Sequence, residues 1–479
     1  MATPIPKNHA RFGLSQVAEI TGGVLIGDDL EIEGVAIDSR AVTAGALFVA
    51  VRGVQQDGAA FIPAAVSAGA AALLVHTGTV VESSLPRVEV ADTTRALGAL
   101  AALHRKRWAR SVVAITGSVG KTTTKDLTAA AFAATALRVH KTTGNLNNQF
   151  GVPMTLLGLS AEHDLAVLEV GTSGPGEIAQ LGAIVQPDVA AVLVASAAHT
   201  EGLGSVSAVA DEKASLFSTL RAGGKAVVNL DDAELSARTP HDLARVSFGT
   251  SEHAQVRLVS ARLRTDGTEV VVHVKDFGEL SLTLSLIGYA AAFDACAALA
   301  CVLALRGENA LLAASNGLRG VQPSPGRMAP RHLARGIVVI DDTYNANPRS
   351  TQVSLETLKE LTVAPETRSI AILSDMKELG ALSQVEHARI GEFCVRNGID
   401  MLVGCGPEMV HATALAARLA AGRLAPNPTR VVHVMDPLDA VRMVRSMWRS
   451  GDVVLVKGSR SLMMERVVEG LCMGEAEAS

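Results

Sequence analysis

A glycine loop between an apolar run and a polar helix start is the most informative chemical feature of this sequence. The run Val112–Ile115 has the character of a buried strand, and Thr116–Lys125 follows it with the sequence TGSVGKTTTK. In such an arrangement the backbone N–H groups of the loop and of the helix N-terminus converge on an anion. A lysine reaches the outer phosphates, and a hydroxyl can bind Mg²⁺. The segment therefore predicts a site for a nucleoside triphosphate.

Seven residues of this loop are expected to contact the nucleotide: Thr116, Gly117, Ser118, Gly120, Lys121, Thr122 and Thr123. Ile115 stands where the longer form of the pattern has a further glycine, so the loop is a shorter variant. On the alternative interpretation, the two glycines only mark the turn from a strand to a helix.

Three side chains further along the chain are candidates for a metal site. Glu169 ends the apolar run Leu165–Val170, where a cation beside phosphates would take an oxygen ligand, and His199 follows the run Val189–Val194. Lys213 lies on an amphipathic helix and would become an oxygen ligand if its neutral amine added CO₂. That reaction requires a lysine pKa below the usual value of about 10.4. The ordinary alternatives are a helix-capping glutamate, a structural histidine and an exposed lysine.

Polar clusters elsewhere have the composition of binding loops. The turn Thr143–Asn148 carries three amides that could hold a polar substrate, and Asp341–Pro348 follows the apolar run Ile337–Ile340. Lys457–Arg460 leaves a strand and opens a helix, so it offers backbone donors and a cation to an anion. Asp38–Arg40 follows a strand end. Each cluster could instead be a hydrogen-bonded turn without a ligand.

Composition and charge argue against several classes of protein. The net charge is −5 and the basic residues are scattered, so nucleic acid is not expected as a partner. The apolar stretch Leu284–Leu305 is interrupted by Asp294, which predicts a core helix rather than a membrane span. Pro4 and Pro6 stand where a secretion signal would be apolar, which favours a cytoplasmic protein. Five cysteines without C-x-x-C spacing predict free thiols rather than disulfides or a zinc site.

The order of apolar runs predicts an α/β protein of three domains. Residues 1–109 are expected to form a small α/β domain. Over 110–322, β-branched runs alternate with helices, which predicts a mainly parallel sheet of the phosphate-loop ATPase type. Pro323–Gly326 is then predicted to be a linker. A second set of apolar runs that alternate with helices predicts a Rossmann-like, doubly wound domain over 323–479.

These motifs together resemble those of the Mur ligases over nearly the whole chain. The matching family motifs are TGSxGKTTTK at Thr116–Lys125, TxGNxNNxxGxP at Thr142–Pro153, ExGxxxxGEI at Glu169–Ile178, DSR at Asp38–Arg40, LFVA at Leu47–Ala50, KGSR at Lys457–Arg460 and MER at Met464–Arg466. The sequence YNANP at Tyr344–Pro348 is similar to that of the members that add D-alanyl-D-alanine. The resemblance implies an N-terminal domain that grips a UDP-sugar peptide, a central ATPase domain and a C-terminal domain that closes over both.

The resemblance also implies a reaction and roles for named residues. ATP would phosphorylate the terminal carboxylate of UDP-N-acetylmuramoyl-tripeptide, and the amine of D-Ala-D-Ala would displace phosphate. Lys121, Glu169, His199 and Lys213 would be the catalytic residues, with Mg²⁺ held by Thr122, Glu169, His199 and a carbamylated Lys213. Further nucleotide contacts would come from Arg327, Asp342 and Tyr344. Substrate contacts would come from Asp38, Ser39, Arg40, Asn145, Asn147, Asn148, Asn345, Asn347, Lys457 and Arg460.

Three positions depart from the family pattern. Gly288–Asp294 reads GYAAAFD where other members carry GxHNxxN to contact adenine, Val119 replaces a frequent asparagine, and Val194–Ala195 replaces a threonine–asparagine pair. We expect ATP to bind with weaker or altered adenine contacts. Two alternatives remain open: another carboxylate–amine ligase of this superfamily, or a nucleotide-binding protein with a decayed catalytic site. We expect a monomer whose partners are small molecules, and the third residue of the tripeptide stays open between meso-diaminopimelate and lysine.

Overall fold

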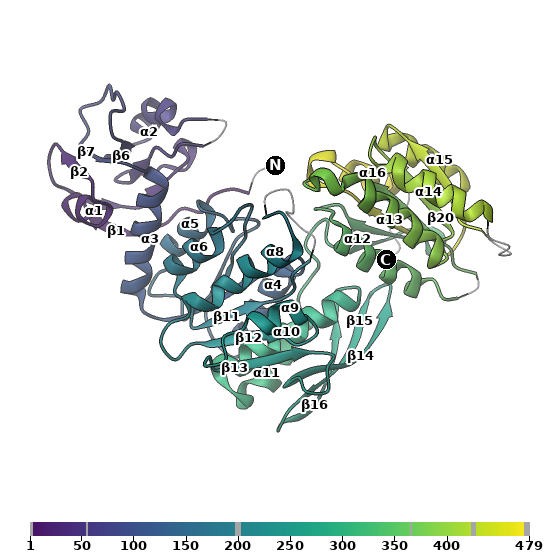
Figure 1. Ribbon diagram of the computed structural model, residues 1–479. Helices are drawn as coiled ribbons and strands as arrows, with labels where there is room; N and C mark the ends of the chain where they lie inside the picture. Colours follow the sequence, from purple (N-terminus) through teal and green to yellow (C-terminus); the bar gives the residue numbers. More distant parts are fainter. Residues whose placement is uncertain (1–2, 54–55, 197–202, 365, 423–427, 474–479) are drawn as a thin grey trace.

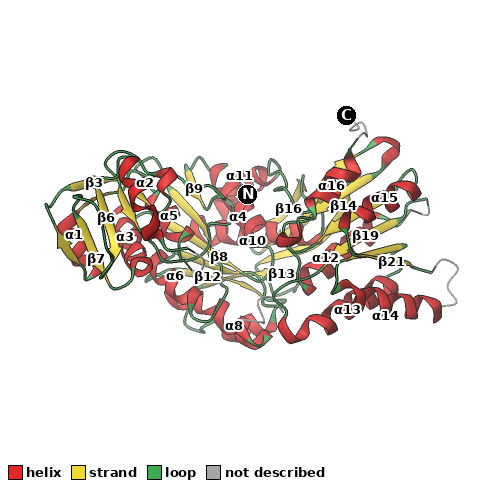
Figure 2. Ribbon diagram, turned by 90° about the horizontal axis from the view of Figure 1, so that it is seen from above, coloured by secondary structure: helices red, strands yellow, loops and turns green. Residues whose placement is uncertain are grey.

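The computed structural model describes residues 3–53, 56–196, 203–364, 366–422 and 428–473, and these form three α/β units in chain order (Figure 1). The N-terminal unit and the C-terminal unit lie at opposite ends of the molecule, with the central unit between them (Figures 1 and 2). Helices cover both faces of the central and C-terminal sheets (Figure 2). The predicted α/β class is confirmed. The residue boundaries of the three predicted domains stay a prediction.

The N-terminal unit is built on a small, mostly parallel sheet. The five strands are ordered β2-β7-β6-β5-β4, and only the edge strand β2 is antiparallel to its neighbour. A separate antiparallel pair joins β1 to β3. The strands are β1 (Arg11–Gly13), β2 (Val24–Ile26), β3 (Glu31–Glu33), β4 (Val35–Ala36), β5 (Leu47–Val49), β6 (Ala72–His76) and β7 (Arg87–Val90), and the helices are α1 (Leu14–Thr21), α2 (Ile62–Ser67) and α3 (Thr93–Trp108).

The central sheet has nine strands in the order β16-β15-β14-β13-β12-β11-β8-β10-β9. The strands from β9 to β14 are parallel to their neighbours, and β14, β15 and β16 extend the sheet as antiparallel hairpins. The strands are β8 (Ser111–Thr116), β9 (Val139–Lys141), β10 (Leu165–Glu169), β11 (Val189–Val192), β12 (Lys225–Asn229), β13 (Arg245–Gly249), β14 (Val256–Arg264), β15 (Gly267–Val274) and β16 (Gly278–Leu284). The predicted parallel sheet is confirmed, whereas the antiparallel extension was not foreseen.

The helices of the central unit pack on both faces of this sheet. They are α4 (Lys121–Ala133), α5 (Gly151–Leu157), α6 (Glu177–Val185), α8 (Val206–Ala214), α9 (Ala233–Arg238), α10 (Tyr289–Arg306) and α11 (Leu311–Leu318). By length and composition alone α10 could cross a membrane, but two thirds of it is buried against α4 and the strands of the sheet. The prediction of a core helix in this stretch is confirmed.

The C-terminal unit has six strands in the order β17-β18-β22-β19-β20-β21, all parallel to their neighbours except the edge strand β17. Its strands are β17 (Ala329–His332), β18 (Val338–Asp342), β19 (Ser369–Ser374), β20 (Met401–Cys405), β21 (Arg430–Val434) and β22 (Val453–Lys457), and its helices are α12 (Pro348–Leu361), α13 (Ser383–Arg396), α14 (Met409–Gly422), α15 (Pro437–Met447) and α16 (Glu465–Cys472). Each apolar run predicted as a strand here is a strand, which confirms the doubly wound interpretation.

Helix α3 joins the N-terminal unit to the central one. One apolar core contains residues of the N-terminal sheet, of α3 and of one face of the central sheet, for example Leu74, Leu97 and Val112. The buried guanidinium of Arg105 on α3 donates hydrogen bonds to the backbone carbonyl of Val185 at 3.1 Å and to that of the following residue. The first two units therefore share one core. The C-terminal unit has two separate cores, one on each face of its sheet.

Candidate active site

The loop between β8 and α4 needs glycine at two positions. Gly120 has φ +85°, and a Cβ on it would lie 2.4 Å from Oδ1 of Asp294 on α10. A Cβ on Gly117 would lie 2.9 Å from the Cβ of Leu193, which directly follows β11. The ammonium of Lys121 donates a hydrogen bond to the carbonyl of Gly117 at 2.7 Å, so the lysine folds back across the loop. This is the geometry of a loop whose backbone and lysine face an anion.

The carboxylate of Glu169 lies at the carboxyl end of β10, next to that loop. The residue is 2% exposed; one carboxylate oxygen accepts a hydrogen bond from the Thr122 hydroxyl at 2.8 Å and the other accepts one from the Asn147 amide at 2.7 Å. Its backbone N–H donates to the Thr142 hydroxyl at 2.9 Å. Two other segments, which contain Thr122 and Asn147, thus fix one buried carboxylate beside the start of α4.

Lys213 lies inside the central unit. It is only 1% exposed, so the alternative of a surface lysine is wrong. Burial and the charge of Lys121 lower the pKa of Lys213 to about 7, although the neighbouring Glu212 raises it. Glu212 itself accepts hydrogen bonds from the backbone N–H groups of Gly176 and Ile178 at the start of α6, which anchors α8 there. A substantial fraction of the Lys213 amine is therefore neutral near pH 7. His199 lies outside the described residues.

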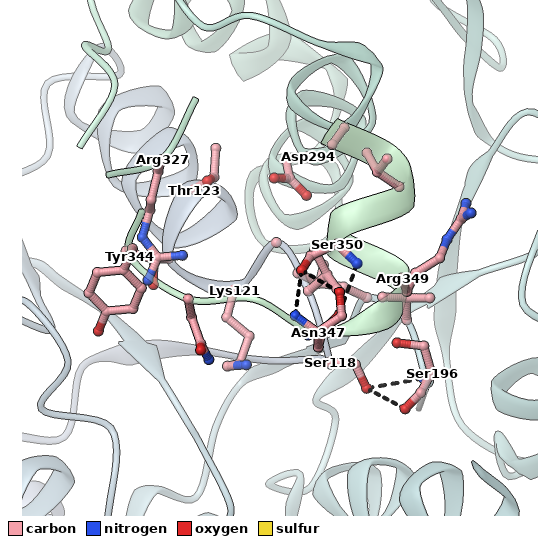
Figure 3. Close-up of a pocket in the computed structure, with 18 of the residues that line it drawn as sticks. Ser118, Lys121, Thr123, Ser196, Asp294, Arg327, Tyr344, Asn347, Arg349 and Ser350 are labelled. Atoms are coloured by element: carbon pink, nitrogen blue, oxygen red, sulfur yellow. Dashed lines mark hydrogen bonds between the residues drawn. The ribbon is translucent and has the colours of Figure 1, made fainter. Parts of the chain in front are cut away.

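A cavity of about 1340 Å³ runs from the loop and Glu169 to the first segments of the C-terminal unit. It collects most of the residues predicted from the sequence: Ser118, Gly120, Lys121, Thr122, Thr123, Asn145, Asn147, Asn148, Glu169, Arg327, Asp342, Tyr344, Asn345, Asn347, Lys457 and Arg460. Figure 3 shows side chains from both units facing the same space. Parallel strands of two sheets end at this cavity, which is the usual position of a ligand site in α/β folds.

Of the predicted residues that the structure describes, six do not line this cavity: Thr116, Gly117, Lys213, Asp38, Ser39 and Arg40. Thr116 is fully buried beneath the loop. Asp38 accepts hydrogen bonds from the backbone N–H and guanidinium of Arg40, whose side chain is 88% exposed, as in the capped turn that was the alternative interpretation.

The C-terminal unit places cationic side chains and an aromatic ring at the cavity. The Arg327 guanidinium lies 3.9 Å from the centre of the Tyr344 ring (Figure 3). The Arg460 guanidinium lies 5.7 Å from the same centre. Lys457 is buried and pairs with the carboxylate of Asp342 at 2.6 Å. Asp342 neutralises Lys457, and the Arg460 guanidinium lies 3.9 Å from the carboxylate of Glu465, so Arg327 is the cation of this group for which the described residues show no ion pair.

Most of the predicted asparagines hold the backbone. The side-chain Oδ1 of Asn148 accepts hydrogen bonds from backbone N–H groups at the start of α5, and Oδ1 of Asn347 accepts one from the first turn of α12. Oδ1 of Asn345 accepts a hydrogen bond from the backbone N–H of the next residue. Asn145 accepts a hydrogen bond from the hydroxyl of Thr3. Among the predicted asparagines only Asn147 contacts the Glu169 carboxylate.

Sequence reasoning missed many residues that line the cavity, among them Asp294, Tyr289 and Lys377. Asp294 and Tyr289 come from the first turns of α10. In the sequence this segment stood out only because it departs from the family pattern that contacts adenine. Lys377 follows β19 and lies 3.4 Å from the carboxylate of Asp375. Its position at the carboxyl end of a predicted parallel strand was a usable signal, the same one that identified Asp342.

Asp294 makes the stability of the protein depend on pH. Burial raises the pKa of its carboxyl from 3.8 to about 8, although Thr124 and Arg327 lower it. Between those two values the folded protein keeps a proton that the unfolded chain releases, so stability falls as the pH rises through this window. We predict that Asp294→Asn, which cannot ionise, melts about 3 °C above the wild type at pH 8.5 and close to it at pH 5.

The measurement is thermal unfolding of both proteins from pH 5 to 9. Asp28→Asn, at an exposed position, is the control and should follow the wild type at every pH. Parallel curves for Asp294→Asn and the wild type would contradict the prediction.

Three family models match this chain. The model of the Mur ligase family, catalytic domain, matches residues 31–105, that of the Mur ligase middle domain matches 115–302, and that of the Mur ligase, glutamate ligase domain, matches 326–460. Together they cover most of the residues that line the cavity.

Curated relatives and solved structures agree with these models. The chain is 36% identical over 462 residues to the UDP-N-acetylmuramoyl-tripeptide–D-alanyl-D-alanine ligase of Escherichia coli (strain K12), with 96% of this chain and 98% of the relative covered. The crystal structure of MurF from Acinetobacter baumannii superposes with a TM-score of 0.86 at 28% identity, covering 98% and 99%. That of the MurF ligase from Thermotoga maritima in complex with ADP superposes with a TM-score of 0.80 at 29% identity, covering 91% and 96%. The chain therefore belongs to the Mur ligase family, in the branch that contains these D-alanyl-D-alanine ligases.

Proposed function

We propose that this chain is an ATP-dependent ligase that joins D-Ala-D-Ala to UDP-N-acetylmuramoyl-tripeptide in peptidoglycan precursor synthesis. One observation carries the proposal: the phosphate loop, the buried Glu169 carboxylate and the arginines of the C-terminal unit face a single cavity. The relatives named above carry this activity in their names.

The chemistry proceeds in two steps. The terminal carboxylate of the tripeptide attacks the γ-phosphorus of ATP, which gives an acyl phosphate and ADP. The amine of D-Ala-D-Ala then attacks the acyl carbon, and the tetrahedral intermediate collapses to the amide with loss of phosphate. Because the first step brings an anion to an anion, cations such as Lys121 and Arg327 must neutralise charge while the loop keeps the reacting groups in line. Excluding water from the acyl phosphate requires the C-terminal unit to close over the central one.

We infer that Thr122 and Glu169 hold the Mg²⁺ of the nucleotide. Their oxygens already lie 2.8 Å apart at the start of α4, and Mg²⁺ prefers oxygen ligands of this kind beside phosphates. When bound, Mg²⁺ would neutralise phosphate charge and fix the angle of attack. We infer a second set of ligands from His199 and a carbamylated Lys213, whose low pKa makes its amine available to CO₂.

In this proposal each of the three predicted domains binds a different substrate. Residues 1–109 hold the UDP-sugar peptide with Asp38, Ser39 and Arg40, residues 110–322 bind ATP, and residues 323–479 bring the amine and close the site. We infer further that the enzyme works as a cytoplasmic monomer.

The function is tested by release of phosphate from ATP by the purified protein. We expect release only when the UDP-tripeptide and D-Ala-D-Ala are both present. Turnover with a single amino acid in place of the dipeptide would favour a sister ligase. Binding of ATP without turnover under any combination would favour a protein with a decayed site.

Loss of the loop lysine or of the strand-end carboxylate is predicted to remove catalysis but not folding. Lys121→Ala and Glu169→Ala should each lower kcat/KM at least about 100-fold, because each removes a charge that acts on the transferring phosphoryl group. Lys106→Ala, an exposed lysine on α3, is the control and should leave kcat/KM unchanged. A normal rate in either site variant, with circular dichroism confirming the fold, would refute the site assignment.

The carbamate proposal for Lys213 has its own test. Lys213→Ala should be nearly inactive and should regain part of its activity with added acetate or formate, because a short carboxylate can replace the oxygens of the carbamate. Lys121→Ala should gain nothing from the same additives. An inactive Lys213→Ala protein that no short acid restores would speak against a carbamate at this position.

A further inference from the structure

Residues 3–10 form an arm that precedes β1 and connects the N-terminal unit to the central one. The start of the chain, drawn in purple, leaves the N-terminal unit and runs toward the middle of the molecule (Figure 1). Asn8 anchors the arm: this residue is buried, its Nδ2 donates to the Val35 carbonyl at 2.7 Å, and its Oδ1 accepts from the Val35 N–H at 3.0 Å. One side-chain amide thus holds both backbone groups of Val35, which fixes the direction in which the arm leaves the N-terminal unit.

The middle of the arm packs at the seam between the first two units. Ile5 packs against the apolar core that these units share, and residues 5–8 line a small cavity together with Met154 of α5. Pro4 and Pro6 flank Ile5 and fix two backbone φ angles near about −65°, which leaves the arm few alternative conformations. The arm is therefore a stiff connection rather than a loose end of the chain.

The tip of the arm contacts the turn Thr143–Asn148. The Thr3 hydroxyl donates a hydrogen bond to Oδ1 of Asn145 at 2.7 Å. Gly144, with φ +53°, permits this approach, because a Cβ there would lie 2.5 Å from the Thr3 hydroxyl oxygen. Asn145 lines the large cavity, whereas Thr3 does not. Since the amide oxygen points to the arm, the NH₂ group of Asn145 is turned away from it, and among the described residues this group has no acceptor.

The same turn holds the carboxylate inferred to bind Mg²⁺. The Asn147 amide donates to Glu169, as described above, and the Asn147 backbone N–H donates to the Asn145 carbonyl at 2.8 Å. The Asn145 amide is therefore tied to the edge of the cavity where the attacking carboxylate of the peptide must meet the γ-phosphate. Two N–H donors at this place suit a carboxylate or carbonyl oxygen of that peptide.

We propose that the arm positions the Asn145 amide so that its NH₂ group donates to an oxygen at the carboxyl end of the peptide substrate. This inference rests on the proposed ligase function, and it makes Thr3 a positioning residue that acts through Asn145. Without the Thr3 hydroxyl the amide can turn over and present its oxygen, which repels the oxygens of the substrate. The expected loss is about 5-fold in affinity, the usual contribution of one hydrogen bond.

The first experiment measures steady-state phosphate release by the full-length protein. Thr3→Val keeps the branched shape but lacks the hydroxyl, so it should raise the KM for UDP-N-acetylmuramoyl-tripeptide about 5-fold and leave the KM for ATP within about 2-fold of the wild type. Thr3→Ser retains the hydroxyl and should restore the wild-type KM. The control is Thr77→Val, at an exposed threonine of the N-terminal unit. An unchanged UDP-tripeptide KM in Thr3→Val, or an equal rise for both substrates, would overturn the proposal.

The second experiment tests whether Thr3 acts through Asn145. Asn145→Ala removes the NH₂ group and should raise the UDP-tripeptide KM about 10-fold, and adding Thr3→Val to this variant should change nothing further. Asn145→Asp keeps the oxygen that Thr3 contacts but replaces the NH₂ group with a second oxygen, so its KM should rise at least as much. Additive effects in the double variant, or a wild-type KM in Asn145→Asp, would overturn the proposal.

Failure of the proposed function is recognised separately. A wild-type protein that neither releases phosphate with all three substrates nor binds the UDP-tripeptide in calorimetry would refute the function and this inference with it. If it binds the UDP-tripeptide without turnover, the function fails, and the same variants are compared by affinity with the same factors expected. A wild type that turns over while Thr3→Val matches it would refute the inference alone.

Discussion

The phosphate loop packs closely against neighbouring side chains at two glycines, and the rest of the site depends on this constraint. Gly117 and Gly120 leave no room for a side chain, because Leu193 presses on one and Asp294 on the other. The loop is therefore held between β11 and α10, and its own side chains Lys121 and Ser118 brace it through the Gly117 carbonyl and the backbone of Ser196. Glu169 and Asn147 complete this arrangement, since the carboxylate is held from two directions. The central unit thus fixes the loop and the carboxylate through its own contacts.

The C-terminal unit contributes groups of a different kind. The Arg327 and Arg460 guanidinium groups both lie near the Tyr344 ring, and the Lys457 ammonium is neutralised by Asp342. Beside the paired lysine, this group carries planar guanidinium groups, which suit phosphate and carboxylate oxygens through paired hydrogen bonds. In the proposed function, the central unit would fix the reacting ends of the substrates, and the C-terminal unit would supply charge from the other side of the cavity.

Motifs tied to strand ends were predictable from the sequence, and contacts between distant segments were not. β8, its loop, β10 with Glu169 and the strands of the C-terminal unit follow from apolar runs and the residues after them. The antiparallel strands β14–β16 were missed because their apolar residues alternate, as in Leu280, Leu282 and Leu284, instead of forming a run. The burial of Lys213 and the contact of Asp294 with Gly120 depend on how helices pack on the sheet, which local sequence does not encode. Amides such as Asn148 and Asn347 were taken for ligand contacts because hydrogen-bonding capacity alone does not reveal that a helix end uses it.

The core that runs from the N-terminal sheet through α3 to the central sheet has a consequence for cooperativity. Apolar side chains of both units are buried against one another, and Arg105 ties the end of α3 to the carbonyl of Val185. Neither unit can lose its packing without exposing the other, so the two should melt together as one block. The C-terminal unit encloses two cores of its own, and among the described residues neither core includes a side chain of the central unit. From the three larger sheets we therefore expect two cooperative blocks, and the cavity lies at the seam between them.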